Sequence, residues 1–531
     1  MKNRIAFILI AAACFMNGCA SKSQESPPSQ GSGDVEEVQV EKEIELEPEN
    51  NDEQTEPSEP SEKSKEDRIK DAGDILQIDL RHTYAVEARE DGIALAMSAY
   101  PQIDVVEASP DLESVLNAYN STKKAECEKE TSDIAALAKD SELEPGDYYK
   151  ADTFAQVMRA DNSVLSLKEV HSGFQGGAHP DFYYVTHNFD SATGKELTIE
   201  DVVNEPEKLP EIIYGLIKED KDTMDMVIVE DVPKAISELL GLTKSEDEGN
   251  PGSIFTIGYD GITFYFSPYA LTAYAAGPIV KTLKYEDYPD LLKAEYKSDT
   301  SSYIVPLDSY TDIEIDGKTL NWNFEEAEED SWSGPISVSF GDQEMQAVAS
   351  GNSGKAYLVK DGNRKYLYVK MSDLGDYYST YIFDLNDSGK SASRLFPMGF
   401  ATDAPTNPWN MEFSGRLDAF STLSYVSHYE LGDDGMPALA EKYSEIIEKH
   451  ELTLKKDIEA EEVDEEGESV GKAELKEGDV ITFYRTDCDH IVDFHDSNGK
   501  IIRFTYSEDI FPQMVNGINA EEVFDGIVYA S

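Results

Sequence analysis

The sequence has 531 residues, which is enough for two to four domains. It contains 107 Asp and Glu residues against 45 Lys and Arg residues, so its formal net charge is −62. Such an acidic surface repels nucleic acid and bare anionic lipid, which excludes both as electrostatic partners. Cationic proteins, cationic peptides and divalent metal ions would be attracted, although the charge would also keep any extracellular protein soluble.

The N-terminus has the pattern of a secretory signal peptide. Lys2 and Arg4 precede an apolar run at residues 5–15, which is too short for a membrane span of about 20 apolar residues. The next residues, MNGC, resemble a lipobox, in which the cysteine is lipidated before the peptidase cuts in front of it. We therefore expect residues 1–18 to be removed and Cys19 to carry the lipid. The alternative is an ordinary signal peptide with an incidental cysteine.

Lipid on Cys19 predicts where the protein resides. Two acyl chains suffice for stable anchoring, so we expect the chain at the extracytoplasmic face of the cell membrane. Residues 19–73 contain no aromatic residue and are dominated by Glu, Ser, Pro, Gln and Asn, which predicts a disordered acidic tether. After the lipidated cysteine only Cys127 and Cys488 remain, far apart in the sequence. We expect no disulfide framework, so the fold must depend on hydrophobic cores.

Strand and helix patterns follow one another from residue 74 onwards. ILQIDLRHTYAVEA and GIALAMSAYPQIDVV predict a hairpin, and residues 110–143 predict a long helix with apolar side chains at helical spacing. Three strands are expected between residues 147 and 197. We then expect three helices, a hairpin and a last strand, at residues 199–203, 209–221 and 232–240, around residues 260–261, and at TLKYED.

Several motifs in this region resemble a known family. In chain order they are GGAHP (176–180), NFD (188–190), TGKELT (193–198), DGI (260–262), FYFSPY (264–269) and AAGP (275–278). They resemble the extracellular domain called DUF3298, and the preceding stretch resembles its usual companion, DUF4163. We assign residues 74–165 to a DUF4163-like part and residues 166–296 to a DUF3298-like part.

The pair of domains is similar to the extracellular part of RsiV-like, lysozyme-sensing anti-sigma factors and to the N-terminal region of a peptidoglycan deacetylase. The resemblance implies an extracellular module that presents a protein-binding surface, with a lysozyme-like cationic protein or cell-wall glycan as ligand. Direct control of a sigma factor is not implied, because we find neither a transmembrane helix nor a cytoplasmic segment. Deacetylation is not implied either, because paired Asp and His metal ligands do not follow the module.

The C-terminal half has mainly strand patterns. Residues 300–450 predict a β-rich domain, with hairpins in KAYLVKDGNRKYLYVKM and YSTYIFDLNDSGKSASRLF, the second turning at residues 387–389. Residues 452–531 predict a small β-barrel or sandwich. The predicted fold class is α+β: a mixed N-terminal module, in which helices accompany an antiparallel sheet, followed by a mostly-β C-terminal half.

The candidate ligand-binding residues come from the DUF3298-like part. They are Gly176, Gly177, His179, Tyr183 and Tyr269. The glycines would supply positive φ or a close backbone approach. The histidine, placed between the glycine pair and a proline, would either order its own turn or face a ligand.

Other constellations give no site. His490, Asp493, His495 and Asp496 form the densest group of metal-ligand types, but strand alternation would split it between two faces. The sequence from residue 384 imitates a calcium loop, yet its twelfth position is Leu395 where a Glu is required. We expect no metal, no cofactor and no catalytic residues, since no serine elbow, Cys–His pairing or zinc helix motif occurs.

These observations favour a non-catalytic, membrane-anchored lipoprotein that binds a lysozyme-like protein or a cell-wall ligand. A cell-wall hydrolase or deacetylase with an unrecognised site is one alternative. A structural surface protein without a small ligand is the other.

Overall fold

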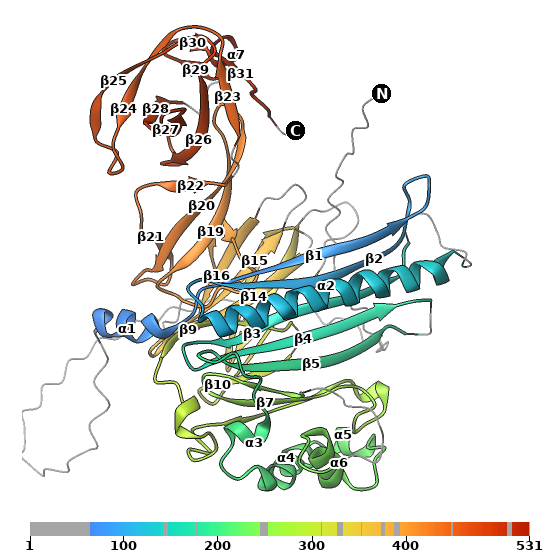
Figure 1. Cartoon of the computed structure of the whole chain (residues 1–531). Helices are drawn as coiled ribbons and strands as arrows, with labels where there is room; N and C mark the ends of the chain where they lie inside the picture. Colours follow the sequence, from blue (N-terminus) through green and yellow to red (C-terminus); the bar gives the residue numbers. More distant parts are fainter. Residues whose placement is uncertain are drawn as a thin grey trace, which may run out of the picture. The chain divides into compact units, whose positions relative to one another are not determined.

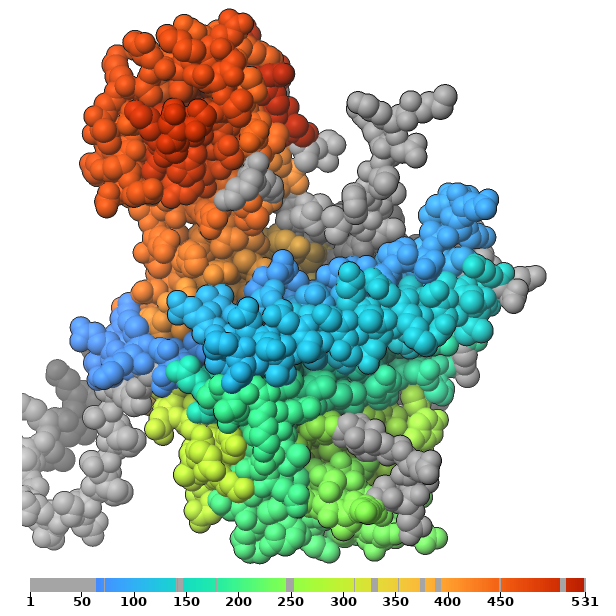
Figure 2. Space-filling view, in the orientation of Figure 1, coloured from blue at the N-terminus to red at the C-terminus, as the bar shows by residue number. Residues whose placement is uncertain are grey.

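The computed structural model describes residues 64–531, apart from gaps at 140, 142–146, 177–178, 245–252, 310, 326–332, 352, 373–377, 387–392, 448–449, 507–511 and 530–531. Residues 65–531, drawn in space-filling form in Figure 2, form one compact unit. About 18% of the chain is helix and 49% is strand, in several antiparallel sheets. The α+β fold class with a mostly-β C-terminal half is therefore confirmed. Within the described residues, no helix is long and apolar enough to cross a membrane.

The N-terminal module combines a hairpin, one long helix and a three-stranded sheet (Figure 1). The hairpin is β1 (Ile78–Ala88) with β2 (Ala94–Val105), and α2 (Pro110–Ala138) follows. The sheet has the order β3 (Lys150–Ala160), β4 (Val164–Phe174), β5 (Asp181–Asp190). The Ser109 side chain caps α2 by accepting from the Leu112 N–H, which fixes its start as predicted.

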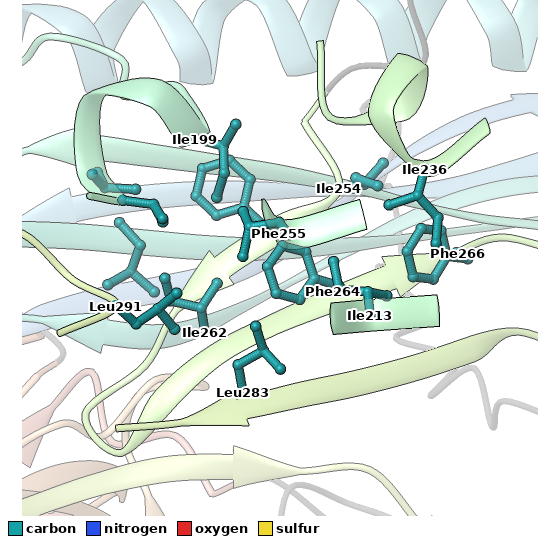
Figure 3. Close-up of a cluster of buried hydrophobic side chains, with 14 of the residues drawn as sticks. Ile199, Ile213, Ile236, Ile254, Phe255, Ile262, Phe264, Phe266, Leu283 and Leu291 are labelled. Carbon is teal, nitrogen blue, oxygen red and sulfur yellow. The ribbon is translucent and has the colours of Figure 1, made fainter. Parts of the chain in front are cut away.

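The following segment is mainly helical and ends in a second three-stranded sheet. Its helices are α3 (Ile199–Val202), α4 (Leu209–Ile217), α5 (Lys221–Asp225) and α6 (Val232–Leu239). The strands are β6 (Phe255–Ile257), β7 (Gly261–Phe266) and β8 (Ile279–Lys284). Figure 3 shows Ile213 and Ile236 of the helices directed at Phe264 and Phe266 of β7, in a cluster of buried hydrophobic side chains. Short 3-10 turns occur at Ala72–Asp74, Pro206–Lys208, Tyr274–Ala276 and Ala294–Tyr296.

Two sheets of the C-terminal half pack face to face. One has the order β10 (Ile313–Ile315), β11 (Lys318–Phe324), β12 (Ser333–Phe340), β13 (Gln343–Ser350). The other has the order β17 (Arg394–Phe396), β16 (Tyr378–Asp384), β15 (Arg364–Ser372), β14 (Ser353–Asp361), β9 (Ser302–Leu307). Side chains from both sheets form one core, which includes Trp322 and Phe383. Of the two predicted hairpins, β14–β15 is confirmed, and the turn at residues 387–389 lies outside the described residues.

Twelve of the remaining fourteen strands form one sheet. They are β18 (Gly399–Phe400), β19 (Met411–Asp418), β20 (Thr422–Leu431), β21 (Pro437–Leu439), β22 (Ser444–Ile446), β23 (Glu451–Leu454), β24 (Ile458–Val463), β25 (Ser469–Leu475), β26 (Val480–Thr486), β27 (Ile491–Asp496), β28 (Ile501–Thr505) and β31 (Phe524–Asp525). β29 (Met514–Val515), β30 (Ile518–Asn519) and α7 (Ala520–Val523) lie beside it. Because β22 pairs with β26, the sheet runs across residue 452, where we expected a separate domain to begin.

Ordered structure begins before residue 74. Helix α1 (Lys65–Asp71) contains Arg68, whose guanidinium lies 2.9 Å from the buried Asp361 carboxylate. Ala72 is fully buried beside Trp409. The expected tether, residues 19–73, was therefore drawn too far into the chain, because its last residues pack against the body; residues 19–63 lie outside the described part.

The N-terminal module is joined to the C-terminal half by polar contacts along β1. The Leu80 N–H donates to Thr402 Oγ1 at 2.9 Å, and His82 Nδ1 lies 2.9 Å from the Asp403 carboxylate. Cys127 is buried and Cys488 partly buried, and neither forms a disulfide.

Candidate binding surface

Aromatic side chains lie around the turn between β4 and β5 in separate groups: Tyr183 stacks on His171, whereas His179 and Tyr269 lie against Tyr274. We call this set the aromatic end; it consists of Phe174, His179, Tyr183, Tyr269 and Tyr274. The exposed fractions are 39% for Phe174, 47% for Tyr183 and 59% for Tyr269, which is high for large apolar rings. Three of the five sequence candidates belong to this set.

His179 orders the turn between the two strands. Its Nδ1 lies 3.0 Å from the Pro180 carbonyl oxygen, and the Tyr274 hydroxyl donates to the same oxygen at 2.8 Å. The His179 and Tyr274 rings stack, with centroids 3.9 Å apart and planes at 22°. Of the two roles considered for His179, turn ordering is confirmed, and the exposed ring remains open to a ligand.

Tyr269 is held in a conformation that tyrosine rarely adopts. Its φ is 69°, in the left-handed region, which costs a non-glycine residue roughly 1–2 kcal/mol. A hydrogen bond from its N–H to the Thr272 carbonyl, at 3.0 Å, closes the turn. The ring centroid lies 5.7 Å from that of Tyr274. The strained backbone thus places the most exposed aromatic ring of the surface next to the His179–Tyr274 stack.

We expected Gly176 and Gly177 to supply positive φ or a close backbone approach, and the structure describes one of these two positions. Gly176 has φ 81°, and a Cβ atom there would lie 2.7 Å from the Tyr149 hydroxyl oxygen. Both reasons given for a glycine, positive φ and close approach, therefore apply to Gly176. Gly177 lies outside the described residues.

Beneath the aromatic end, α2 covers a buried carboxylate. Glu169 on β4 is fully buried. The Tyr119 hydroxyl donates to it at 2.6 Å and the Lys123 ammonium at 2.8 Å. His171 Nε2 lies 2.9 Å from Oε2, and His187 Nε2 lies 3.4 Å from Oε1 without the alignment of a hydrogen bond. These five residues form the Glu169 cluster.

Charges within the Glu169 cluster shift its pKa values. Burial alone would raise the pKa of Glu169, but its contacts with His171 and His187 and the charge of Lys123 hold that pKa well below its usual range. Burial alone would lower the pKa of His187, but the carboxylates of Glu169 and Glu196 raise it to about 9. At neutral pH the buried carboxylate is therefore ionised and His187 is protonated.

The Tyr183 side chain lies among acidic residues. Burial raises the pKa of the Tyr183 hydroxyl, and the nearby carboxylates of Glu130, Glu169, Glu126 and Asp181 raise it further. At Tyr183 the aromatic end thus combines a ring face with nearby carboxylates. This combination suits a guanidinium or ammonium group, which is attracted to both.

The remaining sequence candidates have structural partners or lie outside the described residues. Asp493 is fully buried and bound by Arg485 at 2.9 Å and by Arg503 at 2.7 Å. His495 packs on Tyr484 instead. Among the described residues, no group of three or more His, Cys, Asp or Glu side chains could hold a metal ion. Cys19 lies outside the described part of the chain.

The sequence interpretation missed Glu169, Lys123 and Tyr274. A glutamate at the centre of the strand pattern SLKEVHSG was the available signal, because a charged residue on a covered strand face requires a partner. Lys123 lies on α2, which is separated from β4 in the sequence by the whole of β3, so no local pattern joins it to Glu169. Tyr274 occurs in an irregular segment without periodicity.

Comparison with known proteins identifies one part of the chain. Residues 200–286 match the family described as "Protein of unknown function (DUF3298)". The chain therefore contains a DUF3298 domain, inside the expected range 166–296. No curated protein matches the chain. The resemblance of residues 74–165 to DUF4163, and of both parts to RsiV-like proteins, stays a prediction.

Two solved structures are similar to part of the chain. One is a member of the DUF3298 family from Bacteroides fragilis, 17% identical, covering 41% of this chain and 94% of that one with a TM-score of 0.30. The other is a DUF3298 family protein from Pseudomonas aeruginosa, 13% identical, covering 43% of this chain and 99% of that one with a TM-score of 0.28.

Proposed function

We propose that this chain is a non-catalytic lipoprotein, anchored through Cys19 at the extracytoplasmic face of the cell membrane, whose aromatic end binds a cationic protein such as a lysozyme-like enzyme. The observation that carries the proposal is the exposed ring of Tyr269 on a strained backbone beside the His179–Tyr274 stack. Strain of this kind is retained where a side chain must be held in place for a task.

Charge and geometry together support a cationic ligand. Aromatic rings lose little conformational freedom on binding, and cation–π contacts gain up to about 2 kcal/mol when they are desolvated. Glu126, Glu130 and Asp181 would pair with basic side chains around these rings. Cell-wall glycan, which also stacks on aromatic faces but carries no positive charge, is the second ligand to test.

The binding test uses calorimetric titration of residues 64–531 with lysozyme at two salt concentrations, and with soluble peptidoglycan fragments. We expect saturable lysozyme binding that persists at the higher salt, because a shaped interface is screened less than diffuse attraction. Tyr269→Ala and Tyr183→Ala should each weaken binding about tenfold, equivalent to roughly 1.4 kcal/mol. Tyr84→Ala, which removes an exposed tyrosine of β1 outside the aromatic end, is the matched control.

The outcomes separate the ligands. Binding of peptidoglycan fragments alone, with the same sensitivity to Tyr269→Ala, would replace the protein ligand by glycan. Lysozyme binding that disappears at the higher salt concentration, and that is equally strong for the wild type and both tyrosine variants at the lower one, would contradict a binding role for the aromatic end.

Anchoring needs its own test. Metabolic labelling with palmitate should mark the wild-type protein and not Cys19→Ala, and only the wild type should fractionate with membranes. Equal membrane association of the two proteins would contradict lipidation at Cys19.

A further inference from the structure

Strand β13 forms one edge of the four-stranded sheet and pairs with β12 alone. The two strands are joined by a two-residue turn, with Phe340 opposite Gln343, and their register runs without a bulge to Ser333 opposite Ser350. β13 is eight residues long. Among the described residues, its outer edge is therefore long and regular.

Backbone bonding shows which groups of β13 point outward. The Pro335 carbonyl accepts from the Glu325 N–H on the β11 side, so odd residues of β12 bond to β11 and even ones to β13. Phe340 and Val338 thus bond to Gln343 and Met345. The alternate residues, Glu344, Gln346, Val348 and Ser350, point their N–H and C=O groups away from the sheet. Within the described structure these groups have no hydrogen-bond partner.

The other edges in this half of the chain are blunted or covered. β10 and β17 have only three residues each. β25 carries Gly471 and Lys472 and has a bulge at Val470. On β9, the Ile304 N–H donates to the Thr406 carbonyl at 2.8 Å. Proteins protect edges in these ways because an open edge pairs with other strands. β13 has no proline, lysine or bulge.

The charge of this region is also unusual. Glu344 is the only ionisable residue in the sixteen residues of β12 and β13, whereas 29% of the whole chain is charged. Val348 is 74% exposed, the largest fraction among the exposed apolar side chains of the described residues. A nearly uncharged face with an open edge, on so acidic a protein, indicates a surface that approaches a copy of itself.

We propose that β13 pairs antiparallel with β13 of a second copy, which joins two four-stranded sheets across a two-fold axis. Pairing of the outward groups places Gln346 opposite Val348, and Glu344 opposite Ser350, of the second copy. The two Glu344 carboxylates then lie at opposite ends of the interface and do not face each other. The partner is a second copy rather than a foreign peptide, because this register is self-complementary and keeps like charges apart. The inference does not depend on the ligand proposed for the aromatic end.

The first test is sedimentation velocity of residues 64–531, the unit that contains all the cores described above, over a range of concentrations. We expect a monomer–dimer equilibrium at tens of micromolar that strengthens with added salt, because salt screens the repulsion between two acidic bodies. Val348→Lys, which adds a charge to each copy at the interface, and Gln346→Pro, which removes an outward N–H, should weaken dimerisation at least tenfold. Val470→Lys on β25, also at an exposed edge valine, should have no effect.

The second test checks the register. Gln346→Cys and Val348→Cys proteins, mixed under oxidising conditions, should form a disulfide-linked dimer faster than either variant alone, with the wild type as background for Cys127 and Cys488. A monomer at all concentrations, or equal weakening by Val470→Lys, would overturn the proposal. A dimer without preferential cross-linking of the mixed pair would overturn the β13 register.

Discussion

The ring of Tyr183 lies flat against the ring of His171, with centroids 4.4 Å apart and planes within 5°. The same imidazole reaches the buried Glu169 through Nε2 and the Thr153 hydroxyl through Nδ1, at 2.9 and 3.0 Å. An exposed aromatic residue is thus positioned by a histidine that a buried carboxylate orients. A change in the Glu169 cluster is therefore expected to alter the position of the Tyr183 ring.

Replacing the buried carboxylate should destabilise the fold. Glu169→Gln keeps the shape but removes the buried negative partner of Lys123 and His187, which keep only the more exposed Glu126 and Glu196, so the free energy of unfolding should fall by about 3–5 kcal/mol. Urea denaturation at pH 7 measures the change. The matched control is Glu128→Gln, since Glu128 is exposed on α2 and pairs with Lys124 at 3.8 Å, and it should cost under about 1 kcal/mol. Equal effects of the two variants would contradict the structure of the cluster.

Stability should fall as the pH rises towards 9. The pKa of His187 is raised to about 9 in the folded protein, so its contribution is complete below the ordinary value near 6.5 and is lost as the pH passes 9. The loss should be at most roughly 3 kcal/mol. Burial lowers the pKa of Lys370 to about 8, which acts in the opposite direction over this range. The readout is therefore the difference in urea midpoint between wild type and His187→Gln, which should shrink from pH 6.5 to 9.5; a constant difference would refute the assignment.

Local signals predicted the elements well. The predicted start of the helix at residue 110 is confirmed. It could be predicted because Ser109 supplies a cap and Pro110 fits the first turn. The turn between β14 and β15 is confirmed because Gly362 supplies the positive φ that it needs. The domain limit at residue 452 could not be predicted in this way, because it depends on which distant strands pair. β22 and β26 are joined across many residues, and no local pattern states their partnership.

The candidate site was predicted only in part, because contacts between distant parts of the chain leave no local sequence pattern. His179, Tyr183 and Tyr269 could be selected because they lie in or beside sequence motifs. Tyr274 stacks on His179 from the segment after β7, and Lys123 reaches the buried Glu169 from α2, so both take their places only through tertiary packing. A sequence pattern can suggest that a ring is exposed, but it cannot show which ring it stacks against.

The turn at the aromatic end should depend on glycine. Gly176→Ala combines a strained φ of 81° with a clash at the Tyr149 hydroxyl, so we expect a loss of about 1–2 kcal/mol. The control is Gly92→Ala, where φ is 87° but no atom lies within 4 Å of the new Cβ. Its free energy of unfolding should fall only by the cost of the strained φ, without the cost of a clash. Thermal unfolding compares the two. A larger loss for Gly92→Ala would contradict the close approach at Gly176.

The start of the folded unit can be located by truncation. Helix α1 contributes Arg68 to the buried Asp361, and Lys65 lies over the Trp409 ring at 5.2 Å. Ala72 is also fully buried. A chain that begins at residue 75 leaves this apolar surface open and removes one partner of a buried carboxylate, so its free energy of unfolding should be lower by about 2–4 kcal/mol than that of a chain beginning at residue 64.

Two further proteins complete this truncation experiment. A chain that begins at residue 40 should match the one from residue 64 in urea midpoint, since the packed contacts start with α1. Arg68→Ala in the longer chain should lose less than the truncation, because Asp361 keeps Arg364 and the Ser302 hydroxyl, which donates to it at 2.6 Å. If the chains from residues 64 and 75 unfold at the same urea concentration, α1 is not part of the folded unit, and the tether would extend to residue 73 as the sequence alone indicated.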